Sequence, residues 1–380
     1  MIPSLLSTLY KELCFFLALP VMRDRNKPII NPSIVQFSLT NQCNSKCSMC
    51  NFWKEKKNPK ELSFGEIKQI LNELKSFGIQ KISYTANGEL LTRKDIMDIL
   101  QYTRSLNIDF AINTNGLLII NAFAKQLGAL KPYNVIIGLD TMDDTLYQKI
   151  RGIKDGVKQV KKAIERLKSN GVQTITIGAV ITKDNIDHLL DIAEYVKKEN
   201  LSGLRFTALQ FRGFDKKWSQ DGMNDYTSDI FLYKLKEQIK KLLTFQKKYG
   251  VITNLPPYLE QLPDYYRDHR NFHPLFCVTG FYILKIQPQG EISLCPLCGN
   301  SAIIGNIRKD RIENAWHSEK ARKIRKNISQ KKCVHCWLSC HAEANIRFTP
   351  RYFFPGNFQV MNRYIKAISQ KGNVLDKKLT

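Results

Sequence analysis

The sequence feature that most constrains this chain is a run of three closely spaced cysteines, Cys43, Cys47 and Cys50, with the spacing C-x3-C-x2-C. The run follows a strand-like segment, 34–39, so the thiols should emerge from a loop at the carboxyl end of a strand. Three thiolates do not complete a structural zinc site, which usually takes four protein ligands. On a [4Fe–4S] cluster, where four thiolates are normal, they leave one iron open to a substrate or cofactor.

The cysteine run and its place after a first strand resemble the radical S-adenosylmethionine (SAM) enzymes. The resemblance implies that Cys43, Cys47 and Cys50 hold a [4Fe–4S] cluster whose open iron binds SAM. It also implies reductive cleavage of SAM to a 5′-deoxyadenosyl radical, which takes a hydrogen atom from the substrate. Met49 stands where the family usually has an aromatic residue, and it is also large and apolar. A zinc or redox cysteine cluster is the alternative.

Six strand-like segments alternate with helical patterns in the first part of the chain. They are 34–39, 81–85, 109–113, 134–140, 174–181 and 203–209. Capping-box patterns at Ser63/Glu66 and Thr92/Asp95 predict two of the helix starts. Six βα units indicate an α/β fold, with a parallel sheet and helices outside it. The resemblance sharpens this to a partial (β/α)6 TIM-like barrel with active-site groups at the carboxyl ends of its strands.

Several predicted strand ends carry polar residues that resemble the family's SAM-binding motifs. The segment 87–90 resembles the family's Gly-Gly-Glu-Pro motif, and 113–116 resembles its Thr-Asn-Gly motif. Glycine stands at 138, where the family often has serine, followed by Asp140 and then by Arg151-Gly152. By resemblance, the residues that help to bind SAM are Asn87, Gly88, Glu89, Asn115, Asp140 and Arg151. Arginine suits a carboxylate through its forked donors.

The C-terminal part contains six further cysteines: Cys277, Cys295, Cys298, Cys333, Cys336 and Cys340. Two CxxC pairs among them have zinc-ribbon spacing, so a structural zinc is one interpretation. The region also resembles the SPASM/twitch extension of radical SAM enzymes, a small cysteine-rich α+β extension. This resemblance implies one auxiliary [4Fe–4S] cluster, ligated by Cys277, Cys295, Cys333 and Cys336 and used for electron transfer. Cys298 and Cys340 could exchange with these ligands or support a second, incomplete centre.

The net charge of +24 suggests an anionic partner, or basic residues spread over solvated helix faces. The chain has no stretch of about 20 apolar residues that could cross a bilayer. Residues 1–22 instead show an amphipathic helical pattern. One interpretation is a helix that lies on a membrane surface, and the other is a helix packed across one end of the barrel.

The predicted organisation has four parts. An amphipathic N-terminal helix occupies 1–30, the radical SAM partial barrel 31–255, the SPASM/twitch-like auxiliary-cluster domain 270–345, and an aromatic basic tail 346–380. The pair of prolines at 256 and 257, with Pro263, marks the boundary between the two larger parts.

We therefore expect a cytoplasmic radical SAM oxidoreductase or maturase, with no side chain assigned as a general acid or base. Its expected partners are a reduced electron donor such as a flavodoxin or ferredoxin, and a peptide or a membrane or lipid-linked substrate. Peripheral membrane contact fits the N-terminal helix, and no RNA-binding module is recognisable. The alternative of another class is a non-catalytic zinc or iron–sulfur scaffold, or a nucleic-acid-binding protein.

Overall fold

The computed structural model describes residues 2–54, 60–85, 87–210, 224–269, 271–272, 275–333 and 336–353. Its centre is one nine-stranded sheet with the order β6-β5-β4-β3-β2-β1-β7-β8-β9. The strands are β1 Ile34–Ser38, β2 Lys81–Thr85, β3 Asp109–Thr114, β4 Asn134–Gly138, β5 Ile175–Ile181, β6 Gly203–Ala208, β7 Ile283–Ile286, β8 Glu291–Ser293 and β9 Ile303–Asn306. All six predicted barrel strands are confirmed, with differences only at their ends.

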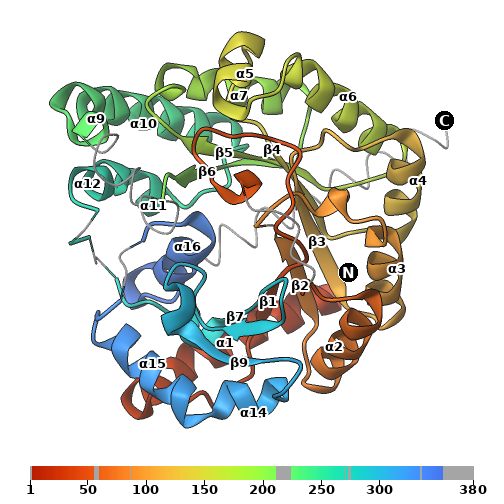
Figure 1. Ribbon diagram of the computed structural model, residues 1–380. Coiled ribbons are helices and arrows are strands. Elements are labelled where there is room, and N and C mark those ends of the chain that lie inside the picture. Colours follow the sequence, from red (N-terminus) through yellow and green to blue (C-terminus); the bar gives the residue numbers. More distant parts are fainter. Residues whose placement is uncertain are drawn as a thin grey trace.

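Helices line the outer face of the curved sheet (Figure 1). The barrel helices are α2 Phe64–Ser76, α3 Ile96–Ser105, α4 Asn121–Leu130, α5 Asp144–Arg151, α6 Gly156–Ser169, α7 Leu189–Lys198 and α10 Asp229–Tyr249. The other helices are α1 Ile2–Arg25, α9 Asn224–Thr227, α11 Pro256–Glu260, α12 Leu262–Arg267, α13 Thr279–Tyr282, α14 Ile312–His317, α15 Glu319–Ser329 and α16 Ser339–Arg347. Strands β1 to β6 are all parallel, as βα units require.

The two faces of the barrel strands differ in burial. On β2, Ile82 and Tyr84 are fully buried against the outer helices, whereas Ser83 and Thr85 are partly exposed. On β6, Leu204 and Phe206 are buried in the same way. Because successive strand side chains point to opposite faces, the main core lies between sheet and helices, and the inner face is polar and partly open.

Of the two predicted capping boxes, one is confirmed and one is wrong. Ser63 accepts a hydrogen bond from the backbone N–H of Glu66, whose carboxylate accepts one from the N–H of Ser63. Helix α3 begins after Asp95, but the Asp95 side chain caps no backbone group and instead pairs with Arg93 at 2.7 Å. Thr92 belongs to the preceding short 3-10 helix. The neighbouring arginine attracts the aspartate away from the helix end.

The C-terminal part joins the same sheet. Strand β7 pairs in parallel with β1, and the β7–β8 hairpin continues the sheet beyond it. Helix α16 packs against β6 at the other edge, where Ser339 Oγ lies 2.7 Å from Thr207 Oγ1. Asn254 also donates to Glu343 of this helix at 2.6 Å. Helix α16 therefore spans the open side of the partial barrel, between its first and last strands (Figure 1). The proposed domain boundaries stay a prediction.

Helix α1 packs against the C-terminal part through one face. Phe15, Leu19 and Met22 are buried there, and the Phe15 ring lies 4.9 Å from Tyr282 and 4.6 Å from Phe348. Helix α1 is thus packed on the protein, as one of the two interpretations expected, but its buried face meets the C-terminal part. Its opposite face leaves four large apolar side chains exposed: Tyr10, Leu13, Leu17 and Val21. No described helix is long and apolar enough to cross a membrane.

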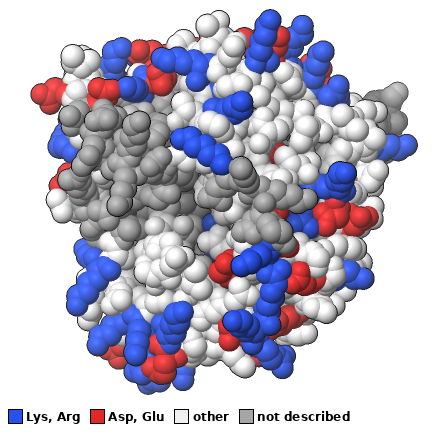
Figure 2. Space-filling model, viewed as in Figure 1, with Lys and Arg blue, Asp and Glu red and all other residues white. Residues whose placement is uncertain are grey.

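The positive charge is spread widely, and part of it gathers on α15. Its exposed basic residues are Lys320, Arg322, Lys323 and Lys326. Figure 2 shows lysine and arginine atoms along the lower edge of the visible face, where α14 and α15 lie in Figure 1. The predicted tail beyond Phe353 lies outside the described residues.

The packing of α1 yields a stability prediction. Phe15→Ala should lower the free energy of unfolding by about 3–5 kcal/mol, because it leaves a cavity between Tyr282 and Phe348. Leu17→Ala is the matched control, since its side chain is 65% exposed, and it should change stability by less than about 0.5 kcal/mol. Urea unfolding measures both. Equal effects of the two substitutions would contradict the packing described for α1.

Candidate active site and metal centres

The loop with Cys43, Cys47 and Cys50 follows β1 at the carboxyl ends of the strands, and all three cysteines are half-buried. The end of α5 holds this loop through the backbone. The N–H of Lys46 donates to the carbonyl of Arg151 at 3.1 Å, and the N–H of Ser48 donates to that of Ile150 at 2.8 Å. These two backbone hydrogen bonds attach the cysteine loop to the end of α5.

The loop after β2 pairs with the segment that enters the cysteine run. The N–H of Gly88 donates to the carbonyl of Thr40 at 3.1 Å, and that of Glu89 donates to Gln42 at 2.6 Å. A Cβ atom at Gly88 would lie 1.9 Å from the Gln42 carbonyl oxygen. Only glycine allows this close approach, which explains the residue type at position 88.

The Glu89 carboxylate, only 3% exposed, links its own loop after β2 to the loop after β3. It accepts hydrogen bonds from the N–H of Leu91 at 3.1 Å, from Thr114 Oγ1 at 2.8 Å and from the N–H of Asn115 at 2.6 Å. Burial raises its pKa, and these three donors oppose that rise. Within this structure, Glu89 therefore shapes the site by holding the loops after β2 and β3.

Asn115 and Asn87 connect neighbouring loops. Asn115 Nδ2 donates to Asn44 Oδ1 at 2.7 Å and to Ser45 Oγ at 2.9 Å, so it contacts the cysteine loop directly. Asn87 donates to Asn41 Oδ1 at 3.0 Å. Sequence reasoning grouped Asn87 with Glu89, but the Asn87 side chain faces β1 and β7 instead.

Asp140 and Arg151 form a buried ion pair beside the cysteine loop. Arg151 Nε donates to Asp140 Oδ2 at 2.7 Å, and Asp140 Oδ1 accepts from the N–H of Val180 at 2.8 Å. A Cβ atom at Gly138 would lie 2.7 Å from the Arg151 guanidinium. The glycine that replaces the family's serine therefore makes room for this arginine.

Two opposing effects act on the pKa values of the thiols in the first cysteine group. Burial raises the pKa of the Cys43 and Cys47 thiols, and the Arg151 guanidinium lowers both. Iron binds the thiolate, so a nearby cation favours the form that a cluster needs.

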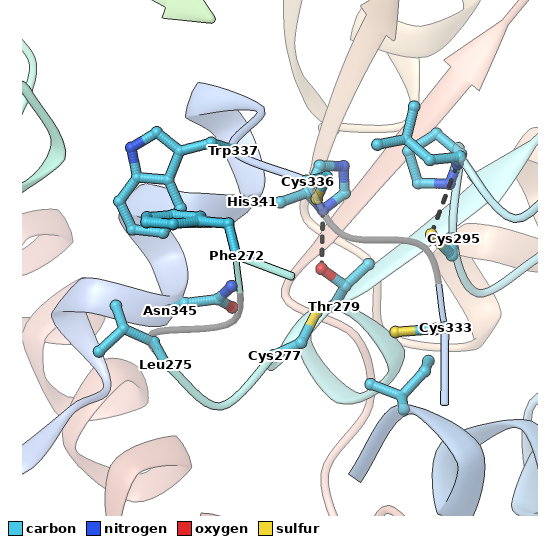
Figure 3. Close-up of a pocket in the computed structure, with 13 residues that line it drawn as sticks. Phe272, Leu275, Cys277, Thr279, Cys295, Cys333, Cys336, Trp337, His341 and Asn345 are labelled. Atoms are coloured by element: carbon cyan, nitrogen blue, oxygen red, sulfur yellow. Dashed lines mark hydrogen bonds between the residues drawn. The ribbon is translucent and has the colours of Figure 1, made fainter. Parts of the chain in front are cut away.

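Four cysteines of the C-terminal group, Cys277, Cys295, Cys333 and Cys336, line one pocket (Figure 3). Its atom-free space is about 560 Å³, part of it open to solvent. They are the four that sequence reasoning selected as auxiliary-cluster ligands. Burial raises the pKa of the Cys333 thiol to about 12. A hydrogen bond with Cys298, together with burial, raises that of Cys295.

His341 also lines this pocket. Its Nδ1 lies 2.8 Å from Thr279 Oγ1, and its buried Nε2 has no hydrogen-bond partner among the described residues. Burial lowers its pKa to about 3, so the ring is neutral. A buried ring nitrogen and four thiols form a donor set that fits an iron–sulfur cluster.

The remaining cysteines lie outside the pocket lining. Cys298 lies beside Cys295, and Cys340 hydrogen-bonds Gln36 of β1 on the barrel side. No group of three or more His, Cys, Asp and Glu side chains in the described chain converges as it would on a single metal ion. In a [4Fe–4S] cluster each thiolate binds a different iron, so its cysteines surround a volume.

Two further residues of the inner barrel were missed by sequence reasoning. Lys285 is 8% exposed on β7, and Arg205 lies on β6 with a buried, unpaired Nε. Each sits at an alternating position within a short apolar strand, which is the available sequence signal.

Family models match most of this architecture. A radical SAM superfamily model matches residues 37–196, and an iron–sulfur cluster-binding (SPASM) domain model matches residues 277–340. A radical SAM domain binds a [4Fe–4S] cluster and SAM, and a SPASM domain binds auxiliary iron–sulfur clusters.

Two curated relatives are similar in sequence. The mycofactocin maturase MftC of Mycolicibacterium smegmatis is 26% identical over 80% of this chain and 75% of the relative. A probable GTP 3′,8-cyclase of Methanococcus aeolicus is 30% identical over 57% of this chain and 73% of the relative.

The fold also resembles solved structures. Streptococcus suis SuiB bound to S-adenosylmethionine superimposes with a TM-score of 0.63 at 17% identity, over 86% of this chain and 76% of SuiB. SuiB bound to its precursor peptide SuiA gives 0.60, over 86% and 75%. The domain matches and the two enzyme relatives contradict the alternative of a non-catalytic zinc or iron–sulfur scaffold or a nucleic-acid-binding protein. The chain belongs to the radical SAM superfamily and is an enzyme with a C-terminal iron–sulfur cluster-binding domain.

Proposed function

We propose that this enzyme cleaves SAM reductively and oxidises a peptide substrate, with an auxiliary cluster for electron transfer. When bound, the SAM cluster supplies the electron that yields a 5′-deoxyadenosyl radical, which takes a hydrogen atom from the substrate. The observation that carries the proposal is the loop with Cys43, Cys47 and Cys50, held to α5 at the carboxyl ends of the strands, together with a pocket lined by four further cysteines.

In this proposal Cys43, Cys47 and Cys50 ligate the SAM cluster. Cys277, Cys295, Cys333 and Cys336 ligate the auxiliary cluster, with His341 beside it. Glu89 and Asn115 hold the SAM-binding loops in place through their bonds to neighbouring backbone and to the cysteine loop. The Asp140–Arg151 pair places a cation beside the cysteine loop, where it suits the SAM carboxylate.

A peptide is favoured as substrate by the extent of the similarities. The similarity to a maturase covers 80% of this chain, whereas that to a GTP cyclase covers 57%. SuiB, which has this fold, is described in complex with a precursor peptide. A flavodoxin or ferredoxin donor and a peripheral membrane contact stay predictions from the sequence.

SAM cleavage tests the proposal directly. Anaerobic enzyme with SAM and dithionite should form 5′-deoxyadenosine, and Cys47→Ala should abolish this because it removes a cluster ligand. Cys14→Ala is the control, since Cys14 lies on α1, belongs to neither cysteine group and does not line the pocket. Absence of 5′-deoxyadenosine from the wild type would contradict the proposal. Peptide should raise turnover above the substrate-free rate, and stimulation by GTP instead would contradict the substrate class.

The contact at Gly88 yields a second test. Gly88→Ala should displace the segment that enters the cysteine run and destabilise the protein by about 1–3 kcal/mol, because its Cβ meets backbone. Gly65→Ala, in the first turn of α2, is the control, since nothing lies within 4 Å of its added Cβ. Urea unfolding and visible cluster absorbance measure the two effects. A Gly88→Ala variant with wild-type stability and absorbance would show that the loops do not meet as described.

A further inference from the structure

The inner face of the barrel carries an unusual charge distribution. Apart from Lys81 and Asp109, which begin their strands, the charged inward-facing residues of β1 to β7 are Arg205 and Lys285. Their inward-facing neighbours are neutral and include Gln36, Ser38, Ser83, Thr85, Asn113, Gly138, Gly178 and Thr207. The middle of the barrel interior is therefore positively charged.

Lys285 is a buried cation with a neutral partner. Its Nζ donates to Asn87 Oδ1 at 3.2 Å, and no carboxylate among the described residues pairs with it. The titratable groups that act on it are the thiols of Cys340 and Cys295. Burial lowers its pKa to about 8, the direction expected for a desolvated ammonium. No described carboxylate neutralises this buried ammonium, so an oxyanion that binds beside it would be stabilised.

Arg205 approaches the same space from the opposite edge of the sheet. It lies on β6 beside Gly178 of β5, and no described acidic side chain forms an ion pair with it. Its Nε is inaccessible to solvent and makes no hydrogen bond with a described residue. The Nε–H group of Arg205 therefore remains available to donate a hydrogen bond to a ligand, at a position that solvent does not reach.

Helix α16 brings the two cations to one place. The Cys340 thiol hydrogen-bonds Gln36, and Ser339, one residue earlier, lies 2.7 Å from Thr207, the next inward-facing residue after Arg205 on β6. Gln36 and Lys285 are register neighbours on β1 and β7. The four residues therefore form one group inside the barrel, which we call the lumen cluster.

The lumen cluster lies between the two proposed cofactor sites. On one side, Lys285 contacts Asn87, next to Gly88 and Glu89 of the loop after β2. On the other side, Lys285 pairs in register with Ser293 of β8, two residues before Cys295, which lines the auxiliary pocket. A substrate that reacts near SAM and passes an electron to the auxiliary cluster would occupy this space.

We propose that Lys285 and Arg205 bind an oxyanion of the substrate, a carboxylate or a phosphate, inside the barrel. The inference rests on the proposed function and adds that the substrate is anionic. An ammonium and a guanidinium form charge-assisted hydrogen bonds with such a group, and each is stronger where water is excluded. A peptide would present an acidic side chain or its C-terminal carboxylate, and a nucleotide would present its phosphates.

Binding of probe pairs that differ in charge tests the proposal. Equilibrium dialysis on reconstituted holoenzyme with SAM would compare GTP with guanosine, and acetyl-glutamyl-glycinamide with acetyl-glutaminyl-glycinamide. In at least one pair the anionic member should bind at least about tenfold more tightly. The pair that shows the preference identifies the source of the oxyanion: a preference for the glutamyl probe agrees with the proposed peptide substrate, whereas a preference for GTP alone would keep the anion site and overturn the peptide substrate.

Substitutions of the two cations test whether they cause the preference for the anionic probe. Lys285→Met and Arg205→Gln should each reduce the preference to under about threefold, while Lys285→Arg should keep it, because the charge remains. Lys158→Met, on the outer face of α6, is the matched control. Equal binding of charged and neutral probes to the wild type, or a preference that survives Lys285→Met, would overturn the proposal. So would a Lys285→Met variant whose defect is in SAM affinity or cluster absorbance alone.

These outcomes separate the inference from the proposed function. If the wild type forms 5′-deoxyadenosine but shows no preference for the anionic probes, the lumen cluster has another role and SAM cleavage stands. If the wild type forms no 5′-deoxyadenosine, the proposed function fails whatever the probes do.

Discussion

The buried carboxylate of Glu89 is the contact on which the geometry of the first cofactor site depends. It holds Leu91, Thr114 and Asn115 at once, and Asn115 in turn holds the cysteine loop through Asn44 and Ser45. Glu89 thus fixes the loops after β2 and β3 relative to each other, and Asn115 links them to the cysteine loop. Such a network is strong when every member is satisfied. It positions the cysteine loop relative to the loops after β2 and β3.

The second organising element is α16, which spans the gap between β6 and β7. Ser339 reaches Thr207, Glu343 reaches Asn254, and Cys340 reaches Gln36. The same helix carries His341 to the auxiliary pocket. The cysteine-rich part therefore completes the barrel wall as well as lining the second pocket, and this places the auxiliary pocket next to the barrel interior. An enzyme that couples hydrogen abstraction to electron transfer needs that proximity.

Much of this arrangement could be predicted from the sequence, and the rest could not for physical reasons. The six barrel strands follow from alternating apolar segments, and the two cysteine groups follow from spacing. The Thr92/Asp95 cap was wrong because Arg93 pairs with Asp95, a local competition that the pattern ignores. The inward direction of Lys285 depends on the pairing of β7 with β1, far away in the sequence. The contacts of Glu89 likewise join separate loops. The resemblance of segment 87–90 to the family motif therefore predicted a role for Glu89 but not its hydrogen-bond partners.

The central claim is that this chain holds two separate iron–sulfur clusters on two cysteine groups. Iron, sulfide and zinc per chain test it most directly, measured on anaerobically purified wild type and on the Cys43/Cys47/Cys50→Ala variant. The account predicts about eight irons in the wild type and about four in the variant, with little zinc. Zinc with little iron in both proteins would contradict it and would make the cysteines structural zinc ligands.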